Sequence, residues 1–245
     1  MPGNDAGMER AFLKLRSRDL LSDEEERVLR DAVADIRELP AEKVMVRAGV
    51  TLSESILLFE GYACRYKGLR DGQRQIMQLH VPGDFLDLHG FLLKQLDHDV
   101  ASMTPVRYAL VPHEALRRIT ETHPHLSRML WFSTLLDAAI HRERILSIGR
   151  RSAMARIAHL FCELQVRLDV VGLTNDFSYR LDLTQGELAD ATGLTSVHVN
   201  RMLKKLREQG VLTFRGGEVH IHDWDALQRA AEFDTSYLHL ERRPR

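Results

Sequence analysis

The sequence has few cysteines, no long apolar run and almost no net charge, and each absence excludes a class of protein. Cys64 and Cys162 are the only cysteines and lie far apart, so we expect neither a disulfide framework nor a zinc site of paired cysteines. No stretch approaches the roughly 18 apolar residues of a membrane span, and residues 1–10 lack the apolar core of a signal peptide. We therefore expect a cytoplasmic protein that makes no membrane contact.

The charges nearly cancel, since 34 Lys and Arg face 35 Asp and Glu for a net charge of −1. A protein that coats nucleic acid with its whole surface is strongly basic, so any nucleic-acid-binding surface here must be local. Hydrophobic residues make up 44 % of the 245 positions, enough for one or two folded domains.

The first half of the chain changes from helical to strand-like patterning. Residues 1–10 are expected to be frayed and 11–38 helical, with Ser22 and the acids behind it marking a helix start. Between about 40 and 112, strand-like runs alternate with glycines. Asp71-Gly72 is typical of a hairpin turn, and Pro82-Gly83-Asp84 predicts another turn. Many short strands at regular spacing predict a β-barrel or jelly roll, which makes the fold class α+β.

The middle of the chain predicts helices over 113–122, from Pro124 to about Ser147, and over 152–168, with Gly149 as a candidate hinge. The long helix carries apolar residues three and four positions apart. They could pack on the barrel, or pair with a second copy of the helix in a homodimer. The residues expected to form that dimer face are Met129, Phe132, Leu136, Ala139, Ile140 and Leu146.

Residues 183–222 predict a winged helix-turn-helix. LTQGELADATG (183–193) reads as a short helix capped by Thr184, and Gly193-Leu194 turns into a second helix over 196–209, capped by Thr195. Val199, Leu203 and Leu206 share the inner face of that helix. Alternating runs around Arg215-Gly216-Gly217 predict a hairpin behind it. The basic face of the second helix could be merely solvated, but in such a module it enters the major groove.

This order of barrel, long helix and winged helix-turn-helix resembles the Crp/Fnr family of bacterial transcription regulators. The resemblance covers about residues 15–223 and is carried by Gly61, Asp71-Gly72, the turn at 82–85 and LTQGELADATGLTSVHVNRMLKKLREQGVL (183–212). It implies a sensor barrel over 11–122, a central dimerisation helix over 123–148, a DNA-binding domain over 149–223 and a tail over 224–245.

The resemblance also implies which residues meet DNA. In the family pattern Thr184 and Thr195 contact phosphates, positions 196, 197, 200 and 201 face bases, and Arg201 matches the base-reading arginine. The full set expected at double-stranded DNA is Thr184, Gln185, Thr195, Ser196, Val197, His198, Asn200, Arg201, Lys204 and Arg215. A palindromic operator, a homodimer and RNA polymerase are the implied partners. Val197 stands where relatives carry a glutamate, so a different operator is expected.

The barrel departs from relatives that bind cyclic AMP, which hold the phosphate with an Arg-Ser or Arg-Thr pair after a Gly-Glu motif. Residues 85–90 have no such glutamate, and Lys94 is the only basic residue between Arg74 and Arg107 apart from histidines. The same span carries several aspartates, which repel phosphate. We therefore expect no response to a cyclic nucleotide, and no cofactor is predicted. The effector stays unknown.

Several alternatives stay open. Two distant cysteines cannot hold the four-thiolate iron–sulfur cluster of oxygen-sensing relatives. Haem or another small ligand in the barrel is a second possibility, given His80, His89 and His98 with Met77 and Cys64 nearby in the sequence. A cupin-like metal enzyme is a distant one, because no His-x-His pair falls in the barrel. A sensor that binds protein and keeps a vestigial DNA head is another.

Overall fold

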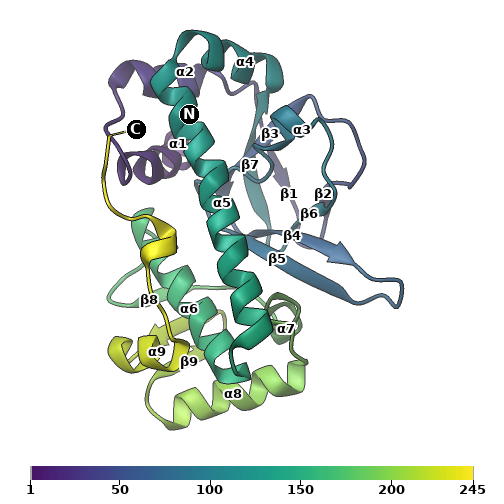
Figure 1. Cartoon of the computed structure of the whole chain (residues 1–245), viewed down its shortest axis with the longest axis vertical. Helices are drawn as coiled ribbons and strands as arrows, with labels where there is room; N and C mark the ends of the chain where they lie inside the picture. Colours follow the sequence, from purple (N-terminus) through teal and green to yellow (C-terminus); the bar gives the residue numbers. More distant parts are fainter. Residues whose placement is uncertain (1, 245) are drawn as a thin grey trace. The chain divides into compact units, whose positions relative to one another are not determined.

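The computed structural model describes residues 2–244, with the backbone alone for residues 2–5. These residues form two compact units (Figure 1). The first unit contains the described residues up to Tyr66, then Leu79–Ala139 and those from His239 onward. The second contains Lys67–Gln78 and Ile140–Leu238. No helix in the described part of the chain is long and apolar enough to cross a membrane.

The β-rich part consists of a three-stranded sheet in the order β1-β7-β3 and a four-stranded sheet in the order β2-β6-β4-β5. β7 pairs antiparallel with both β1 and β3, and β6 pairs antiparallel with both β2 and β4. The predicted jelly-roll class is confirmed. The strands are β1 (Asp35–Leu39), β2 (Val44–Val46), β3 (Glu54–Glu60), β4 (Ala63–Gly68), β5 (Arg74–His80), β6 (Asp99–Ser102) and β7 (Val106–Pro112).

Both predicted turns are present. Gly72 closes the turn between β4 and β5 with a φ of +85°. Gly83 has a φ of +90°, and a Cβ there would lie 2.9 Å from the Arg10 carbonyl oxygen. Only glycine combines that backbone conformation with so close an approach.

The N-terminal prediction is wrong at both of its ends. Helix α1 (Pro2–Arg16) includes residues expected to be frayed, and β1 falls inside the range expected to be helical. Residues 35–39 are extended because they pair with β7, from Asp35 opposite Leu110 to Leu39 opposite Val106. Helix α2 (Asp23–Asp31) does begin after Ser22, where Ser22 and Glu25 form a capping box.

Two apolar clusters stabilise the first unit. One lies between the sheets and joins Leu58, Ala63, Leu86, Val100 and Leu110. The other packs α1, α2 and the helices after β7 against β3 and β7. Those later helices are α4 (His113–Thr122), with the predicted bounds, and α5 (Pro124–Arg150). A short helix, α3 (Gly90–Leu93), precedes β6.

The second unit is mainly helical, with a small sheet in the order β8-β10-β9. Ser152, rather than Gly149, marks the break between helices, since α5 runs to Arg150 and the Ser152 side chain caps α6. The elements are α6 (Ala153–Val170), β8 (Ser178–Arg180), α7 (Gln185–Thr192), α8 (Ser196–Glu208), β9 (Leu212–Arg215), β10 (Glu218–Ile221), α9 (Trp224–Ala231) and a 3-10 turn at Ser236–Leu238.

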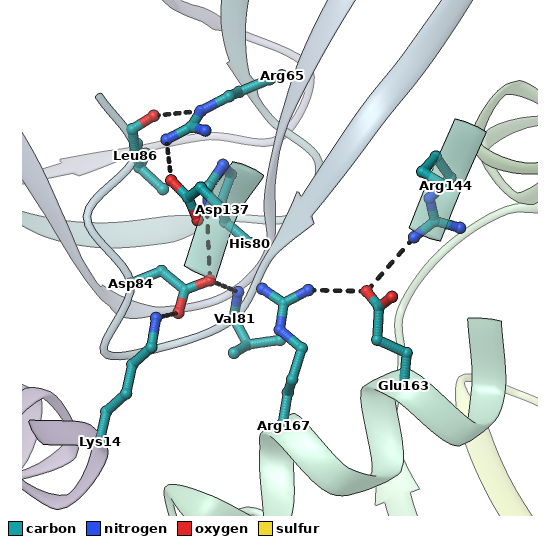
Figure 2. Close-up of polar contacts among 10 residues, drawn as sticks. All are labelled: Lys14, Arg65, His80, Val81, Asp84, Leu86, Asp137, Arg144, Glu163 and Arg167. Carbon is teal, nitrogen blue, oxygen red and sulfur yellow. Dashed lines mark hydrogen bonds and ion pairs between the residues drawn. The ribbon is translucent and has the colours of Figure 1, made fainter. Parts of the chain in front are cut away.

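A buried carboxylate ties three of these elements together. Glu163 of α6 accepts hydrogen bonds from Arg144 of α5 (3.4 Å) and Arg167 (3.0 Å), as Figure 2 shows, and from the Tyr237 hydroxyl (3.0 Å). Burial by itself would raise the pKa of Glu163, but the two guanidinium groups outweigh it and hold that pKa below its ordinary value. Glu163 is therefore an anion at neutral pH, which fixes the helices against the C-terminal turn.

Candidate nucleic-acid interface

Local sequence sets the bounds of the two helices of the helix-turn-helix. The Thr184 hydroxyl accepts a hydrogen bond from the Glu187 amide at 3.2 Å, and the Thr184 amide donates to the Glu187 carboxylate at 2.7 Å. This capping box starts α7, and Gly193 ends it in the left-handed conformation with a φ of +63°. Thr195 then caps α8 through the His198 amide. Both predicted helices and their caps are confirmed.

Helix α8 is buried on one side only. Val199, Met202, Leu203 and Leu206 form its inner face, as the spacing predicts. Every residue expected at DNA is exposed, and Val197 keeps 78 % of its surface accessible. These exposed residues are Thr184, Gln185, Thr195, Ser196, Val197, His198, Asn200, Arg201, Lys204 and Arg215.

The exposed side of α8 has little internal pairing. The Asn200 side-chain amide donates to the Gln185 side-chain oxygen at 3.2 Å, which joins the start of α7 to α8. Lys204 lies 3.7 Å from Glu208 on the helix surface, a separation at which an exposed ion pair contributes little. Arg201 has no recorded contact with the described residues other than those of the helix backbone. Its guanidinium therefore extends from α8 with its donors available.

A tight hairpin follows α8. β9 pairs antiparallel with β10, and the turn between them places Gly216 and Gly217 at φ values of +57° and +78°. Two consecutive positive φ values are typical of a type I′ turn, which favours glycine at both positions. A Cβ at Gly217 would also lie 2.3 Å from a carboxylate oxygen of Asp182. Arg215 is exposed directly before this turn, so the predicted wing is confirmed as a structural element.

The barrel interior is occupied by its own charged side chains. Arg65 is 1 % exposed, and its guanidinium donates to the Leu86 carbonyl at 2.7 Å and to Asp137 at 2.8 Å (Figure 2). His80 lies 3.3 Å from Asp84, which also pairs with Lys14. The cavity beside Lys14 and Asp137 measures about 20 Å³, which holds about one water molecule.

These groups are not arranged as a phosphate site. Burial raises the pKa of Asp87 to about 7, and one of its oxygens accepts a hydrogen bond from the Ile56 amide at 2.6 Å. Arg65 is committed to Asp137. The barrel thus offers acidic side chains and a paired guanidinium, where a phosphate needs free donors and positive charge.

The histidines and cysteines of the barrel lie in different settings. Burial, reinforced by the charge of Arg65, lowers the pKa of His80 to about 4. His98 contacts Asp97 at 2.8 Å and stacks on His89. Cys64 and Cys162 are buried free thiols, and burial raises the pKa of Cys162. Among the described residues, no group of three or more His, Cys, Asp or Glu is placed to hold a metal ion.

The face expected to pair two α5 helices is largely wrong. Met129, Leu136, Ala139 and Ile140 are at most 4 % exposed, because the chain encloses them itself. Such side chains offer no surface to a partner. Phe132 is half-buried and Leu146 is 48 % exposed. Sequence spacing could not separate the two apolar faces of α5, since both follow three-four periods.

The opposite face of α5 carries large apolar side chains in water. Trp131, Leu135 and Ile145 are 66 %, 52 % and 72 % exposed. With Ala138 and Arg142 they recur at intervals of four, three, four and three residues. This is the period of a coiled-coil seam, and the exposed signal was missed because it needs the fold to show which face is buried.

Comparison with known proteins matches both units. A cyclic nucleotide-binding domain model matches residues 36–123, and a Crp-like helix-turn-helix domain model matches residues 155–230. The chain is 28 % identical over 199 residues to the transcriptional activator protein FnrL of Cereibacter sphaeroides, covering 79 % of each chain. It is 28 % identical over 167 residues to the nitrogen fixation regulation protein FixK of Bradyrhizobium diazoefficiens, covering 68 % of this chain and 69 % of that relative.

The fold is also that of a solved regulator. The structure of FixK2 from Bradyrhizobium japonicum superposes with a TM-score of 0.74 at 24 % identity, covering 81 % of this chain and 97 % of that one. The cupin-like enzyme alternative is wrong, because the relatives are transcription regulators and not enzymes. Barrel, central helix and helix-turn-helix occur here in the order that the sequence predicts, and the chain belongs to the Crp/Fnr family of transcription regulators.

Proposed function

We propose that the chain regulates transcription as a homodimer that reads a two-fold symmetric DNA operator with helix α8. The observation that carries the proposal is the division of α8 into a buried apolar face and an exposed polar face with Arg201 extended from it. An α-helix fits the major groove of B-DNA, and residues near its N-terminus then reach base edges.

The exposed residues support a division of roles. Arg201 suits the two acceptors of a guanine, and Asn200 suits an adenine. Val197 can pack on a thymine methyl group but cannot accept a hydrogen bond from cytosine, so the operator differs from that of relatives with glutamate there. Ser196 lies beside Val197 and adjusts the sequence preference.

Other exposed groups contact the DNA backbone. Thr184, Thr195, His198 and Lys204 surround the reading residues, and Arg215 projects from the wing. Gln185 holds Asn200 in place and can also reach a phosphate. Such contacts carry much of the affinity and make it depend on salt.

The dimer that we propose uses the exposed seam of α5, namely Trp131, Leu135, Ala138, Arg142 and Ile145. Two parallel α5 helices would bury these side chains against each other at the intervals of a coiled coil. The seam replaces the predicted face, and Leu146 borders it. A two-fold dimer then matches an operator with two half-sites.

The regulator that we propose does not respond to a cyclic nucleotide. The paired Arg65 and the small cavity beside Asp137 support this. RNA polymerase is a further partner that we propose, because the relative FnrL is named a transcriptional activator. Transcription in vitro from a template that carries the selected operator tests it, and the polymerase proposal is wrong if output does not depend on the regulator.

Selection of bound duplexes from a random pool, with the purified full chain and no added ligand, tests the proposed function. A symmetric motif with half-sites about 34–36 Å apart is the expected result. The matched control is Val199→Ala, which alters the buried face of α8 and should weaken the fold without changing the selected motif. Enrichment of an asymmetric motif, or of none above the level of scrambled DNA, contradicts the proposal.

A further inference from the structure

The first unit contains an open cavity of about 550 Å³ that the DNA-reading function does not use. It lies outside the barrel, between α3, α4 and α5. Its walls include Leu88 and Phe91 around α3, Leu116 and Thr120 of α4, and Leu130 and Trp131 of α5. Sites for small molecules occupy about 300–1,000 Å³ and are mostly apolar, so both size and lining fit one.

The rim of this cavity is apolar and exposed. Leu92, Leu93 and Trp131 line it with 77 %, 64 % and 66 % of their surfaces accessible. Single exposed apolar residues are ordinary, but three large ones around one hollow form a patch of the kind that marks a binding site. An apolar occupant would remove that surface from water, at about 25 cal/mol per Å².

The polar groups in the lining specify an uncharged ligand. The lining residues include no Asp, Glu, Lys or Arg. Burial, followed by the charge of Arg65, lowers the pKa of His89 to about 3, so its imidazole is neutral at pH 7. An anion or cation would lose its hydration here without gaining a counter-charge.

Hydrogen-bonding capacity is confined to one end of the cavity. The hydroxyls of Thr120 and Thr134 donate to carbonyls of their own helices, each at 2.7 Å. His89 and Ser127 have no recorded side-chain hydrogen bond to the described residues. A neutral imidazole has one donor and one acceptor, and a hydroxyl has both. The ligand therefore combines a large apolar body with one or two hydrogen-bonding groups.

We propose that this cavity binds an uncharged, mainly apolar small molecule, with its polar end at His89 and Ser127. The ligand would pack on the first turns of α5, the helix that continues into the second unit as far as Arg150. If it binds one conformation of α5 better than another, it shifts the population toward that conformation. The proposal concerns binding alone and does not depend on DNA recognition.

The test uses N-phenyl-1-naphthylamine, a neutral apolar probe with one N–H donor that accepts excitation energy from tryptophan. Trp131 and Trp224 are the two tryptophans, so the full chain with Trp224→Phe reports on Trp131 alone. Saturable probe fluorescence with quenching of Trp131 emission, at one probe per chain, is expected. Thr120→Phe and Ser127→Phe place a ring in the cavity and should weaken binding about tenfold or more, a loss of about 1.4 kcal/mol.

Thr122→Phe is the matched control, because it makes the same change on an exposed position of α4 that does not line the cavity. It should bind the probe like the parent. The proposal is overturned if binding does not saturate, or if Thr120→Phe and Thr122→Phe bind equally while both retain the parent's cooperative melting.

A second copy of the chain is the competing occupant, because Trp131 also belongs to the proposed dimer seam. Ile145→Asp lies on that seam but not in the cavity, and should dissociate the dimer. Retained probe binding at one per chain in this variant supports a site formed by one chain. Loss of binding would show that a partner completes the hollow, and would overturn the proposal.

Discussion

Arg201 and Arg207 stand on the same helix and are both exposed, yet only Arg201 lies near the N-terminal half of α8 that reaches base edges. Arg201→Ala should therefore cost about 1–3 kcal/mol of binding to the operator and relax the preference at one base pair. Arg207→Ala should leave the preference intact. Competition binding with single-base operator variants measures both, and an unchanged specificity ratio in Arg201→Ala would show that another residue reads that base.

Asp87 predicts a dependence of stability on pH. Burial raises its pKa to about 7, from an ordinary value of 3.8, so the folded protein keeps a proton that the unfolded chain has already lost between these values. The stability contributed by protonated Asp87 is complete below about pH 4 and is lost as the pH rises to about 7, at up to about 1.4 kcal/mol per unit.

Asp87→Asn removes this titration and keeps an oxygen for the Ile56 amide. The free energy of unfolding of the parent minus that of the variant should fall between about pH 4 and pH 7 and stay level above. Urea unfolding at a series of pH values measures it. Parallel curves for the two proteins would mean that Asp87 titrates normally.

Arg65 and Asp137 form the buried pair that fills the barrel. Asp137→Ala leaves a guanidinium of 2 % side-chain exposure without that carboxylate, which should cost about 3–5 kcal/mol. The double variant Arg65→Met with Asp137→Leu should recover most of the loss, because it removes both charges. Urea unfolding of the three proteins tests this, and a double variant no more stable than Asp137→Ala would mean that the pair stabilises by more than mutual neutralisation.

At the scale of elements, the helix-turn-helix depends on its caps. Thr184→Ala removes the hydroxyl that accepts the Glu187 amide and should lower stability by about 1 kcal/mol, with a further loss of DNA affinity if the hydroxyl also meets a phosphate. Thr184→Ser retains the hydroxyl and is the control. Thermal unfolding and operator binding separate the two effects, and equal stability of the Ala and Ser variants would contradict the capping role.

Local sequence predicted the elements whose ends are set by local contacts. α4 has its predicted bounds, and the capping residues Ser22 and Thr195 start their helices as expected. β1 was missed because residues 35–39 are extended only through pairing with β7, some seventy positions later. α9 was missed because residues 224–231 were judged together with an uninformative tail, although Asp223 caps the helix.

At the scale of the whole molecule, the exposed seam of α5 predicts the oligomeric state. Ile145→Asp places a carboxylate in the seam and should convert a dimer into monomers with weaker operator binding. Leu20→Asp makes the same kind of change at a residue that is 69 % exposed outside the seam, and should leave the dimer intact. Sedimentation equilibrium distinguishes them, and a dimeric Ile145→Asp protein would place the interface elsewhere.

The sequence by itself determined the order of the elements, the caps and turns, and the exposed polar face of α8 with Arg201, Asn200 and Val197, because these follow from neighbours within one or two helical turns. Only the tertiary structure decided which face of α5 is buried, that Arg65 pairs with Asp137 inside the barrel, and that α3, α4 and α5 enclose a hollow. These features join residues that are distant in the chain, and the periodicity of a single segment carries no information about them.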